Sequence, residues 1–578
     1  MAPARRARTT LAPHNATTGT ATTGKDLKDA LWKAADKLRG SMDAAEYKHF
    51  VLGLIFLKYV SDAFAERHAS LPPAAPPAAI PVPDADTGTE SGAVPAAEHA
   101  FRGPDDPAAY TGSGVFWVPP GARWEAITRH ADASGRGGEP VGPLLDTALR
   151  AIAATNPPLA HALPVDLFTV RGVDNRRLGE LVGLIDRIGF GDQLAPDGRR
   201  RSARDVLGEV YEYCLARFAA AEGRRGGEYF TPACVVRLLV EVVEPRPGER
   251  VYDPACGSGG MFVQAEKFIE SHGGCTAPEI TVHGQELNQH TWRLAGMNLA
   301  IHGIAADLGS RWGDVFHDDR HPGLRADVVM ANPPFNISDW GGEQLADDPR
   351  WRYGTPPPGN ANYAWLQHMA AKLAPGTGRA GIVLANGSMS SEQSGEGAIR
   401  RAMVEDDVVA CMVALPGRLF RSTQIPVCLW FLARDKSPRG EAGYTDRRGQ
   451  ILFIDARGLG EMVGRTEREL TPGDISRIAG TYHAWRGTPS ARERRLAYED
   501  VPGFCRSAGP EEIRAHDYVL TPGRYVGSPE PGDATDDGGA AEDAVESIAR
   551  LRKELFAHFE ESARREAVVR AQWGGIGG

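Results

Sequence analysis

The chain has little of what secreted and membrane proteins need. Its 578 residues include 7 cysteines, none in Cys-x-x-Cys spacing, so neither a disulfide framework nor a zinc knuckle is expected. The longest apolar run, residues 50–57, is far shorter than the roughly 20 residues that cross a bilayer. The basic start at residues 5–8 is followed by Thr, Ala and Asn instead of the apolar stretch of a signal peptide. We therefore expect a cytoplasmic protein with reduced thiols.

The chain also lacks the excess of positive charge that a protein coating nucleic acid would carry. Its 65 Lys and Arg are outnumbered by 75 Asp and Glu, which gives a formal net charge of −10. Any contact with nucleic acid must therefore come from local basic patches or from a partner. The hydrophobic fraction of 42% is large enough to build cores, which excludes a largely disordered chain.

Composition and periodicity divide the chain into four segments. In order, they are a tail at 1–24, a helical domain at 25–220, an α/β domain at 221–485 and a C-terminal region at 486–578. An Ala- and Pro-rich insertion at 71–99 interrupts the helical domain. The C-terminal region ends in a predicted helix at 543–570, which is either a docking element or a solitary surface helix.

The α/β segment predicts the fold class. Its apolar, strand-like runs are 250–252, 280–283, 327–331, 381–385, 408–415, 427–432 and 451–455. Amphipathic stretches such as 261–271 and 289–302 lie between several of them and predict helices. This alternation is typical of a Rossmann-like fold, in which helices cover both faces of a mostly parallel, doubly wound sheet.

A Gly-rich turn between a predicted strand and a predicted helix is the strongest single motif. Its candidate ligand-binding residues are Asp253, Gly257, Ser258, Gly259 and Gly260. Glycines let the backbone approach a ligand, and a helix N-terminus offers unpaired N–H groups, although a tight structural turn is the competing interpretation. Glu286, after the next predicted strand, suits the two hydroxyls of a ribose. Because position 262 is Phe, the full Gly-x-Gly-x-x-Gly pattern is missing, which favours a cofactor with a ribose but no pyrophosphate.

A second motif, Asn332-Pro333-Pro334-Phe335, directly follows the predicted strand 327–331. Ligands bind at the carboxyl ends of strands in such sheets. The Asn332 side-chain carbonyl and the Pro333 backbone carbonyl could accept both hydrogens of one planar amino group, which would direct its nitrogen lone pair toward an electrophilic methyl group. Pro333 and Pro334 stiffen the loop, and Phe335 offers a face to a flipped base. The competing interpretation is a Pro-rich turn with a core Phe.

Two further segments are candidates for the same ligands. The first is the loop before the first strand, with residues Glu228, Tyr229, Phe230, Thr231 and Pro232. This loop could fold over a cofactor, or Thr231-Pro232 could simply begin a helix at 233–243, with Pro at its first position. The second is Asp314, which could accept a hydrogen bond from an adenine amino group or be an ordinary surface aspartate.

Three other sequence patterns do not indicate a further functional site. Residues 19–25 nearly match a phosphate-binding loop, but Asp26 replaces the required Ser or Thr and no strand precedes it. His317 and His321 have i,i+4 spacing, but Pro322 and the lack of a third ligand favour a loop, so we predict no metal. The sequence contains no Pro-Cys dipeptide, which argues against a cytosine-C5 methyltransferase with a nucleophilic cysteine.

Together these motifs resemble the S-adenosylmethionine-dependent adenine-N6 DNA methyltransferases. Residues 253–262 resemble the family's cofactor motif, 332–335 its catalytic motif, and 227–232 its cofactor-covering motif, in the order of the gamma arrangement. The resemblance implies that S-adenosyl-L-methionine is the cofactor. It also implies that 227–232, 258–260 and Glu286 contact this cofactor.

A narrower resemblance, to the modification subunit of type I restriction–modification systems, rests on 58–62, 116–119, 122–124, 205–213 and 517–527. It implies methylation of adenine N6 in DNA by a complex with a separate specificity subunit. Two copies of the chain and an optional restriction nuclease/translocase subunit are also implied. The roughly 120 residues after the last predicted strand are few for a base-reading module, which agrees with a separate DNA-reading partner.

Three alternatives remain open on sequence grounds. A self-sufficient adenine methyltransferase of another phage-defence system would modify DNA without a partner. A protein-glutamine methyltransferase would also suit an Asn-Pro-Pro-aromatic site, but the N-terminal helical domain and the C-terminal region argue against it. A catalytically idle scaffold for a DNA-binding complex is opposed by the intact motifs at 257–260 and 332–335.

Overall fold

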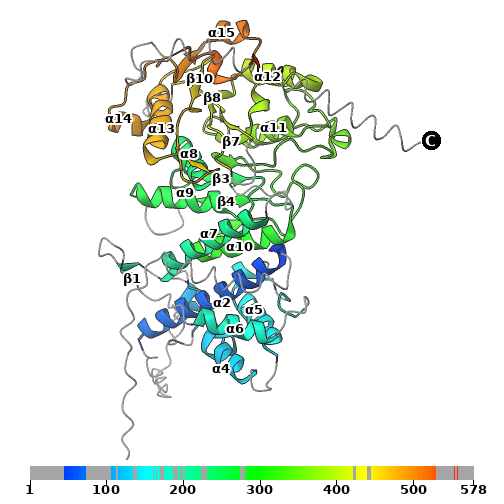
Figure 1. Ribbon diagram of the computed structural model, residues 1–578, viewed down its shortest axis with the longest axis vertical. Helices are drawn as coiled ribbons and strands as arrows, with labels where there is room; N and C mark the ends of the chain where they lie inside the picture. Colours follow the sequence, from blue (N-terminus) through cyan, green and yellow to red (C-terminus); the bar gives the residue numbers. More distant parts are fainter. Residues whose placement is uncertain are drawn as a thin grey trace, which may run out of the picture.

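The computed structural model has a helical unit at one end and an α/β unit at the other (Figure 1). The described residues are 44–72, 104, 106–111, 115–134, 140–160, 162–164, 166–169, 175–186, 193–194, 200–201, 203–222, 231–273, 280–420, 425–438, 444–528, 552–553 and 556. The tail at 1–24, nearly all of the insertion at 71–99 and most of the predicted helix at 543–570 lie outside them. So do Glu228, Tyr229 and Phe230.

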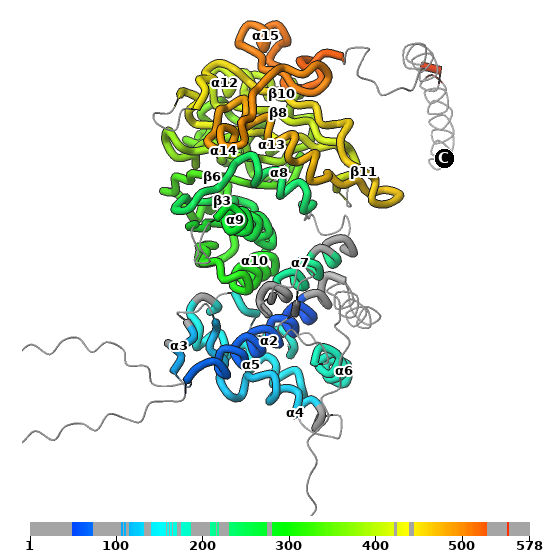
Figure 2. The backbone as a smooth tube through the Cα atoms, turned by 90° about the vertical axis from the view of Figure 1, so that its left-hand side faces the viewer, coloured from blue at the N-terminus to red at the C-terminus, as the bar shows by residue number. Residues whose placement is uncertain are grey.

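Helices build the N-terminal unit, and their order agrees with the helical periodicity of the sequence. They are α2 (Ala44–Ser70), α3 (Ala108–Thr111), α4 (Trp124–Ser134), α5 (Val141–Thr155), α6 (Asn175–Asp186) and α7 (Ala203–Glu222). Their core also takes in Leu294 and Ile301 of helix α10 (Gln289–His302), which belongs to the α/β unit. The Tyr59 hydroxyl of α2 donates a hydrogen bond to the Ile301 carbonyl at 3.2 Å. The core of the N-terminal unit therefore extends onto α10, and α7 and α10 lie at the junction of the two units (Figure 2).

The α/β unit is organised around a nine-stranded sheet with the order β13-β10-β8-β9-β7-β6-β3-β4-β5. The strands are β3 (Arg250–Asp253), β4 (Thr281–Gly284), β5 (Ala306–Asp307), β6 (Val328–Ala331), β7 (Arg379–Ala385), β8 (Val409–Ala414), β9 (Val427–Ala433), β10 (Ile451–Asp455) and β13 (Cys505–Ala508). Most pairs are parallel, but β9 is antiparallel to β7 and β8, and β13 is antiparallel to β10. The predicted fold class is confirmed, and the sheet continues past residue 485 through β13.

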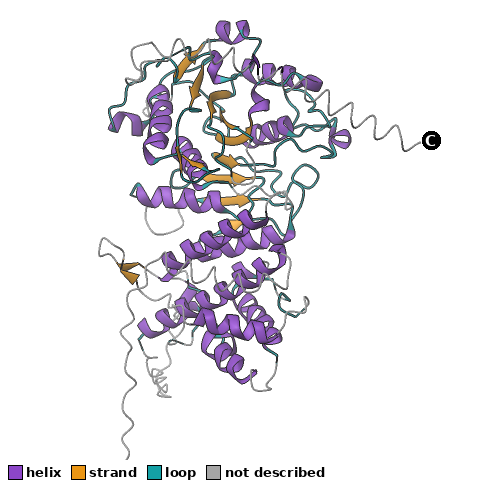
Figure 3. Ribbon diagram, viewed as in Figure 1, coloured by secondary structure: helices purple, strands orange, loops and turns teal. Residues whose placement is uncertain are grey.

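Helices cover both faces of this sheet (Figure 3). Alternate residues of β6 enter different hydrophobic clusters, with Val328 on one side and Val329 on the other. The first cluster includes side chains of α8 (Ala233–Val243), α9 (Gly260–Ser271) and α13 (Pro472–Arg486), and the second includes those of α11 (Asn362–Lys372) and α12 (Glu396–Glu405). Burial on both faces explains why the strands are continuous apolar runs in the sequence. Among the described helices, none is long and apolar enough to cross a membrane.

Candidate active site

The two main motifs lie side by side at the carboxyl ends of neighbouring strands. β3 pairs in parallel with β6, with Val251 opposite Val328 and Tyr252 opposite Val329. The turn that follows Asp253 and the loop that begins at Asn332 therefore leave the sheet at the same edge. A cofactor beside one motif can thus meet a substrate held by the other, as group transfer requires.

Glycine shapes the turn after β3. Gly257 and Gly259 have φ angles of +55° and +78°, in the left-handed region that favours glycine. Helix α9 begins directly after Gly259, and no described side chain caps it. A Cβ atom added at Gly257 or Gly260 would meet no described atom within 4 Å. The turn thus combines an uncapped helix N-terminus with open space, as the binding of a polar ligand requires.

Glu286 reaches back from the end of β4 to this turn. One of its carboxylate oxygens accepts a hydrogen bond from the Gly257 N–H at 3.0 Å, and the other accepts one from the Asn288 N–H at 2.8 Å. The structure therefore brings Glu286 to the turn, as the motif spacing suggested. Next to it, the apolar side chain of Leu287 is 65% exposed, a feature that the sequence analysis missed. An apolar residue directly after an acidic one at a strand end was the signal that could have revealed it.

Asp314 lies in a loop tied to the same strand end. The Gly313 N–H donates to the Glu286 carbonyl at 2.9 Å, and the Gln285 side chain donates to the Gly313 carbonyl at 3.0 Å. One carboxylate oxygen of Asp314 accepts a hydrogen bond from the Phe316 N–H at 2.9 Å. Asp314 is therefore close in the fold to the Glu286 segment, while its contact with an adenine remains a prediction.

Asp253, at the end of β3, is 2% exposed and accepts a hydrogen bond from the Ala255 N–H at 2.9 Å. Burial, with a smaller contribution from the charge of Glu286, raises the pKa of Asp253 to about 8. A raised pKa means that the folded state prefers the protonated form. The stabilising contribution of this carboxyl to the free energy of unfolding is fully present below its unfolded pKa of about 4. This contribution is lost as the pH rises through 8.

Asp253→Asn should therefore become more stable than the wild type as the pH rises. An amide keeps the oxygen that accepts from Ala255 but cannot ionise. The difference in free energy of unfolding should grow between pH 5 and 8 to on the order of a few kcal/mol. Thermal melting of both proteins without ligand, in matched buffers, measures this difference. Parallel stability curves across that range would contradict the raised pKa.

Thr231 orients the side chain of Asn332. The Asn332 Nδ2 donates to the Thr231 Oγ1 at 2.8 Å, across 101 residues of sequence. The Asn332 Oδ1 is buried and has no hydrogen-bond partner among the described residues. A buried acceptor left without a donor costs about 1–3 kcal/mol, and an amino group that binds there recovers this energy. The site therefore has a preoriented acceptor where the sequence predicted one.

This contact corrects the expected role of the Thr231-Pro232 pair. Proline was predicted at the first position of helix α8, but Pro232 lies one residue earlier, at its N-cap, with no capping side-chain bond from the described residues. The Thr231 hydroxyl serves Asn332 instead. Sequence patterns could not reveal this contact because it depends on the packing of α8 beside β6.

The loop after Asn332 is anchored at its far end by a second asparagine. Phe335 lies edge-on to Phe420, with 6.2 Å between ring centroids. At the next residue, Asn336, φ is +52°. The Asn336 N–H donates to the Asn362 Oδ1 at 3.0 Å, and the Asn362 Nδ2 donates to the Asn336 Oδ1 at 2.8 Å. Asn362, buried at the start of α11, thus holds the loop that follows β6, and the sequence analysis did not single it out.

Comparison with known proteins identifies the class that this fold and site define. The signature of the family described as N-6 DNA Methylase matches residues 202–534, and that of the HsdM N-terminal domain matches residues 27–188. The first match spans both strand-end motifs. The chain is an adenine-N6 DNA methyltransferase, as predicted.

Related proteins that align with most of the chain identify a narrower class of adenine-N6 DNA methyltransferase. The chain is 45% identical to the type I restriction enzyme HindI methylase subunit of Haemophilus influenzae over 470 residues, covering 80% of this chain and 100% of that protein. It is 34% identical to the MjaIX methylase subunit of Methanocaldococcus jannaschii, covering 87% and 84%. The crystal structure of a type I methyltransferase subunit from Streptococcus thermophilus shares the fold, with a TM-score of 0.66, 24% identity and coverage of 87% and 100%. The chain belongs to the methylase subunits of type I restriction enzymes.

Proposed function

We propose that the chain binds S-adenosyl-L-methionine beside the Gly-rich turn. The uncapped start of α9, the open space at Gly257 and Gly260, and the return of Glu286 to the turn support this assignment. Asp253, Ser258 and Gly259 complete the turn, and 228–232 and Asp314 are the further proposed contacts. When bound, the cofactor supplies an activated methyl group, so the protein's part is to hold and orient the reactants.

The target amino group is proposed to bind at Asn332, and the buried, unpartnered Oδ1 is the observation that carries this proposal. The Asn332 and Pro333 carbonyls accept the two hydrogens of the adenine N6 amino group. Pro334 stiffens the loop, and Phe335 offers its ring to the base. The base must be extruded from the duplex to reach this depth, as in other enzymes that modify bases.

A DNA-binding specificity subunit is the proposed partner, with two copies of this chain per complex and an optional restriction subunit. The net charge of −10 makes this chain a poor binder of the DNA backbone, which supports a partner that supplies most of those contacts. The predicted helix at 543–570, outside the described residues, remains the candidate docking element.

A reconstitution experiment tests this function. The chain is expressed with and without a candidate specificity protein from the same genome, and transfer of tritium from methyl-labelled cofactor to duplex DNA is measured. We expect N6-methyladenine at one sequence, made by the complex but not by the chain alone. Equal methylation by the isolated chain would favour a self-sufficient enzyme, and methylated cytosine would contradict the assignment.

Thr231→Val should lower kcat for DNA methylation by about 10- to 100-fold, because a freely rotating Asn332 amide presents its acceptor less often. The affinity for the cofactor should fall by less than the rate does, because Thr231 is only one of several proposed cofactor contacts. Thr231→Ser is the matched control, since it keeps the hydroxyl and should restore most of the rate. If the serine variant is as slow as the valine variant, the hydroxyl does not orient Asn332.

A further inference from the structure

A second group of chemistry-bearing side chains lies at the β5 edge of the sheet. His283 on β4 and Asp307 on β5 are paired across parallel strands, and His321 comes from the loop that precedes β6. The Asp307 Oδ2 is 3.8 Å from the His283 Nδ1 and 3.7 Å from the His321 Nδ1. One ligand atom from each residue lies within 4.8 Å of the other two. We propose that these three residues bind a divalent transition-metal ion, with zinc as the expected occupant.

The donor set fits this class of ion. Two imidazoles and one carboxylate are typical protein ligands of zinc, with bond lengths of about 2.0–2.2 Å. A tetrahedral ion with such bonds holds its ligand atoms roughly 3.3 Å apart. The two separations from the Asp307 Oδ2, 3.7 and 3.8 Å, are a few tenths of an ångström longer than that value, and all three ligand atoms lie within 4.8 Å of one another. The exposed carboxylate of Asp307 gives the ion a path from solvent.

Both histidines are prepared to act as ligands. The His321 ring is buried, and its Nε2 donates to the Gly284 carbonyl at 2.9 Å. This bond places the ring proton on Nε2 and leaves the lone pair of Nδ1 directed at the cluster. The His283 Nδ1 is buried without a hydrogen-bond partner among the described residues.

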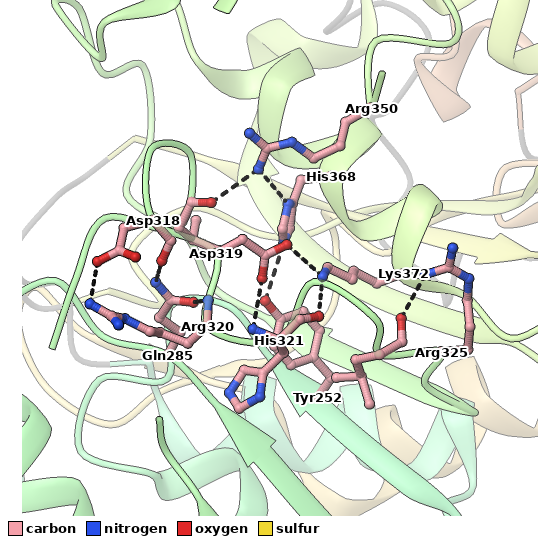
Figure 4. Close-up of polar contacts among 12 residues, drawn as sticks. Tyr252, Gln285, Asp318, Asp319, Arg320, His321, Arg325, Arg350, His368 and Lys372 are labelled. Atoms are coloured by element: carbon pink, nitrogen blue, oxygen red, sulfur yellow. Dashed lines mark hydrogen bonds and ion pairs between the residues drawn. The ribbon is translucent and has the colours of Figure 1, made fainter. Parts of the chain in front are cut away.

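The loop that carries His321 is already fixed in place (Figure 4). The His321 N–H donates to the Asp319 Oδ1 at 2.9 Å, and its carbonyl accepts a hydrogen bond from the buried Lys372 Nζ at 2.5 Å. Lys372 also bonds to the Asp319 Oδ2 at 2.6 Å. The Gln285 side chain holds the same loop through the Asp318 carbonyl at 2.8 Å. Such preorganisation lowers the free-energy cost of assembling a metal site. A bound ion would also link this loop to the end of the strand that precedes Glu286.

The i,i+4 spacing of the histidines does not indicate this cluster. His321 was compared with His317, four residues earlier, and no third ligand was found. In the structure His317 bonds to the Trp340 carbonyl at 3.1 Å instead. The partners of His321 come from β4 and β5, and only the pairing of these two strands brings them together.

Titration of the full-length protein tests the proposal. After treatment with a chelator, the protein is titrated with Zn²⁺ by calorimetry and with Co²⁺ by visible absorption. We expect one ion per chain, ligand-field bands for Co²⁺, and a melting temperature that rises with Zn²⁺ concentration. Failure of the stripped wild type to bind a stoichiometric ion would overturn the proposal.

Variants assign the ion to these residues. Asp307→Asn keeps the Oδ1 that accepts from the Gly309 N–H at 2.9 Å but replaces the charged Oδ2. It should weaken Zn²⁺ binding by about 100-fold, and His283→Gln should do the same. His317→Gln is the matched control and should bind Zn²⁺ as the wild type does. Unchanged binding in both Asp307→Asn and His283→Gln, or equal loss in the control, would place the ion elsewhere.

Discussion

Replacing Asn332 with alanine should reduce methyl transfer to DNA by on the order of 10³-fold or more. The variant loses the acceptor that holds the target amino group and directs its lone pair. Cofactor binding should survive, because the Gly-rich turn and Glu286 lie on other strand ends of the sheet. Tritium transfer by the complex with the specificity subunit gives the rate, and calorimetry on the chain gives the cofactor affinity.

Two comparisons separate chemistry from folding in this experiment. Asn332→Asp keeps an acceptor oxygen in the same place and should retain more activity than the alanine variant. Phe335→Ala should abolish methylation as well, whereas Phe335→Tyr, which keeps the ring, should remain active. Full methylation by Asn332→Ala or by Phe335→Ala would overturn the catalytic assignment. Loss of cofactor binding in Asn332→Ala would point to a structural role instead.

Gly257→Asp should abolish cofactor binding, with an affinity at least about 100-fold weaker than wild type, or roughly 2.8 kcal/mol. The new side chain would enter the open space beside the turn at a backbone φ of +55°. Its carboxylate would also add negative charge near Glu286, which already accepts a hydrogen bond from the Gly257 N–H. Calorimetric titration with S-adenosyl-L-methionine measures the loss.

Gly273→Asp is the matched control for this variant. Gly273 also has a positive φ, +91°, and a Cβ there meets no described atom within 4 Å, but it follows the opposite end of α9. The control therefore introduces the same residue and similar backbone strain away from the turn. It should bind the cofactor normally. Undiminished binding by Gly257→Asp would contradict the proposed cofactor site, and equal weakening in the control would indicate a general effect on folding.

Local sequence patterns predicted the helices and strands that have strong apolar periodicity or clear glycine and proline residues at their ends. Strand β10 and helices α8 and α10 have the bounds that apolar runs, helical spacing and flanking glycines or prolines indicated. Strands β5 and β13 were not predicted. β5 has two exposed residues, and β13 is an edge strand with mixed burial. They are strands because β4 and β10 supply their backbone partners, which no local pattern encodes.

By itself, the sequence determined the family and the alternation of strands and helices that places the two candidate motifs at strand ends. Tertiary structure alone decided which distant side chains meet. Thr231 reaches Asn332 and Asn362 holds Asn336, while His283 and His321 converge on Asp307. Apolar periodicity and turn residues act over a few neighbours, whereas each of these contacts depends on strand order and on the path of a loop between strands.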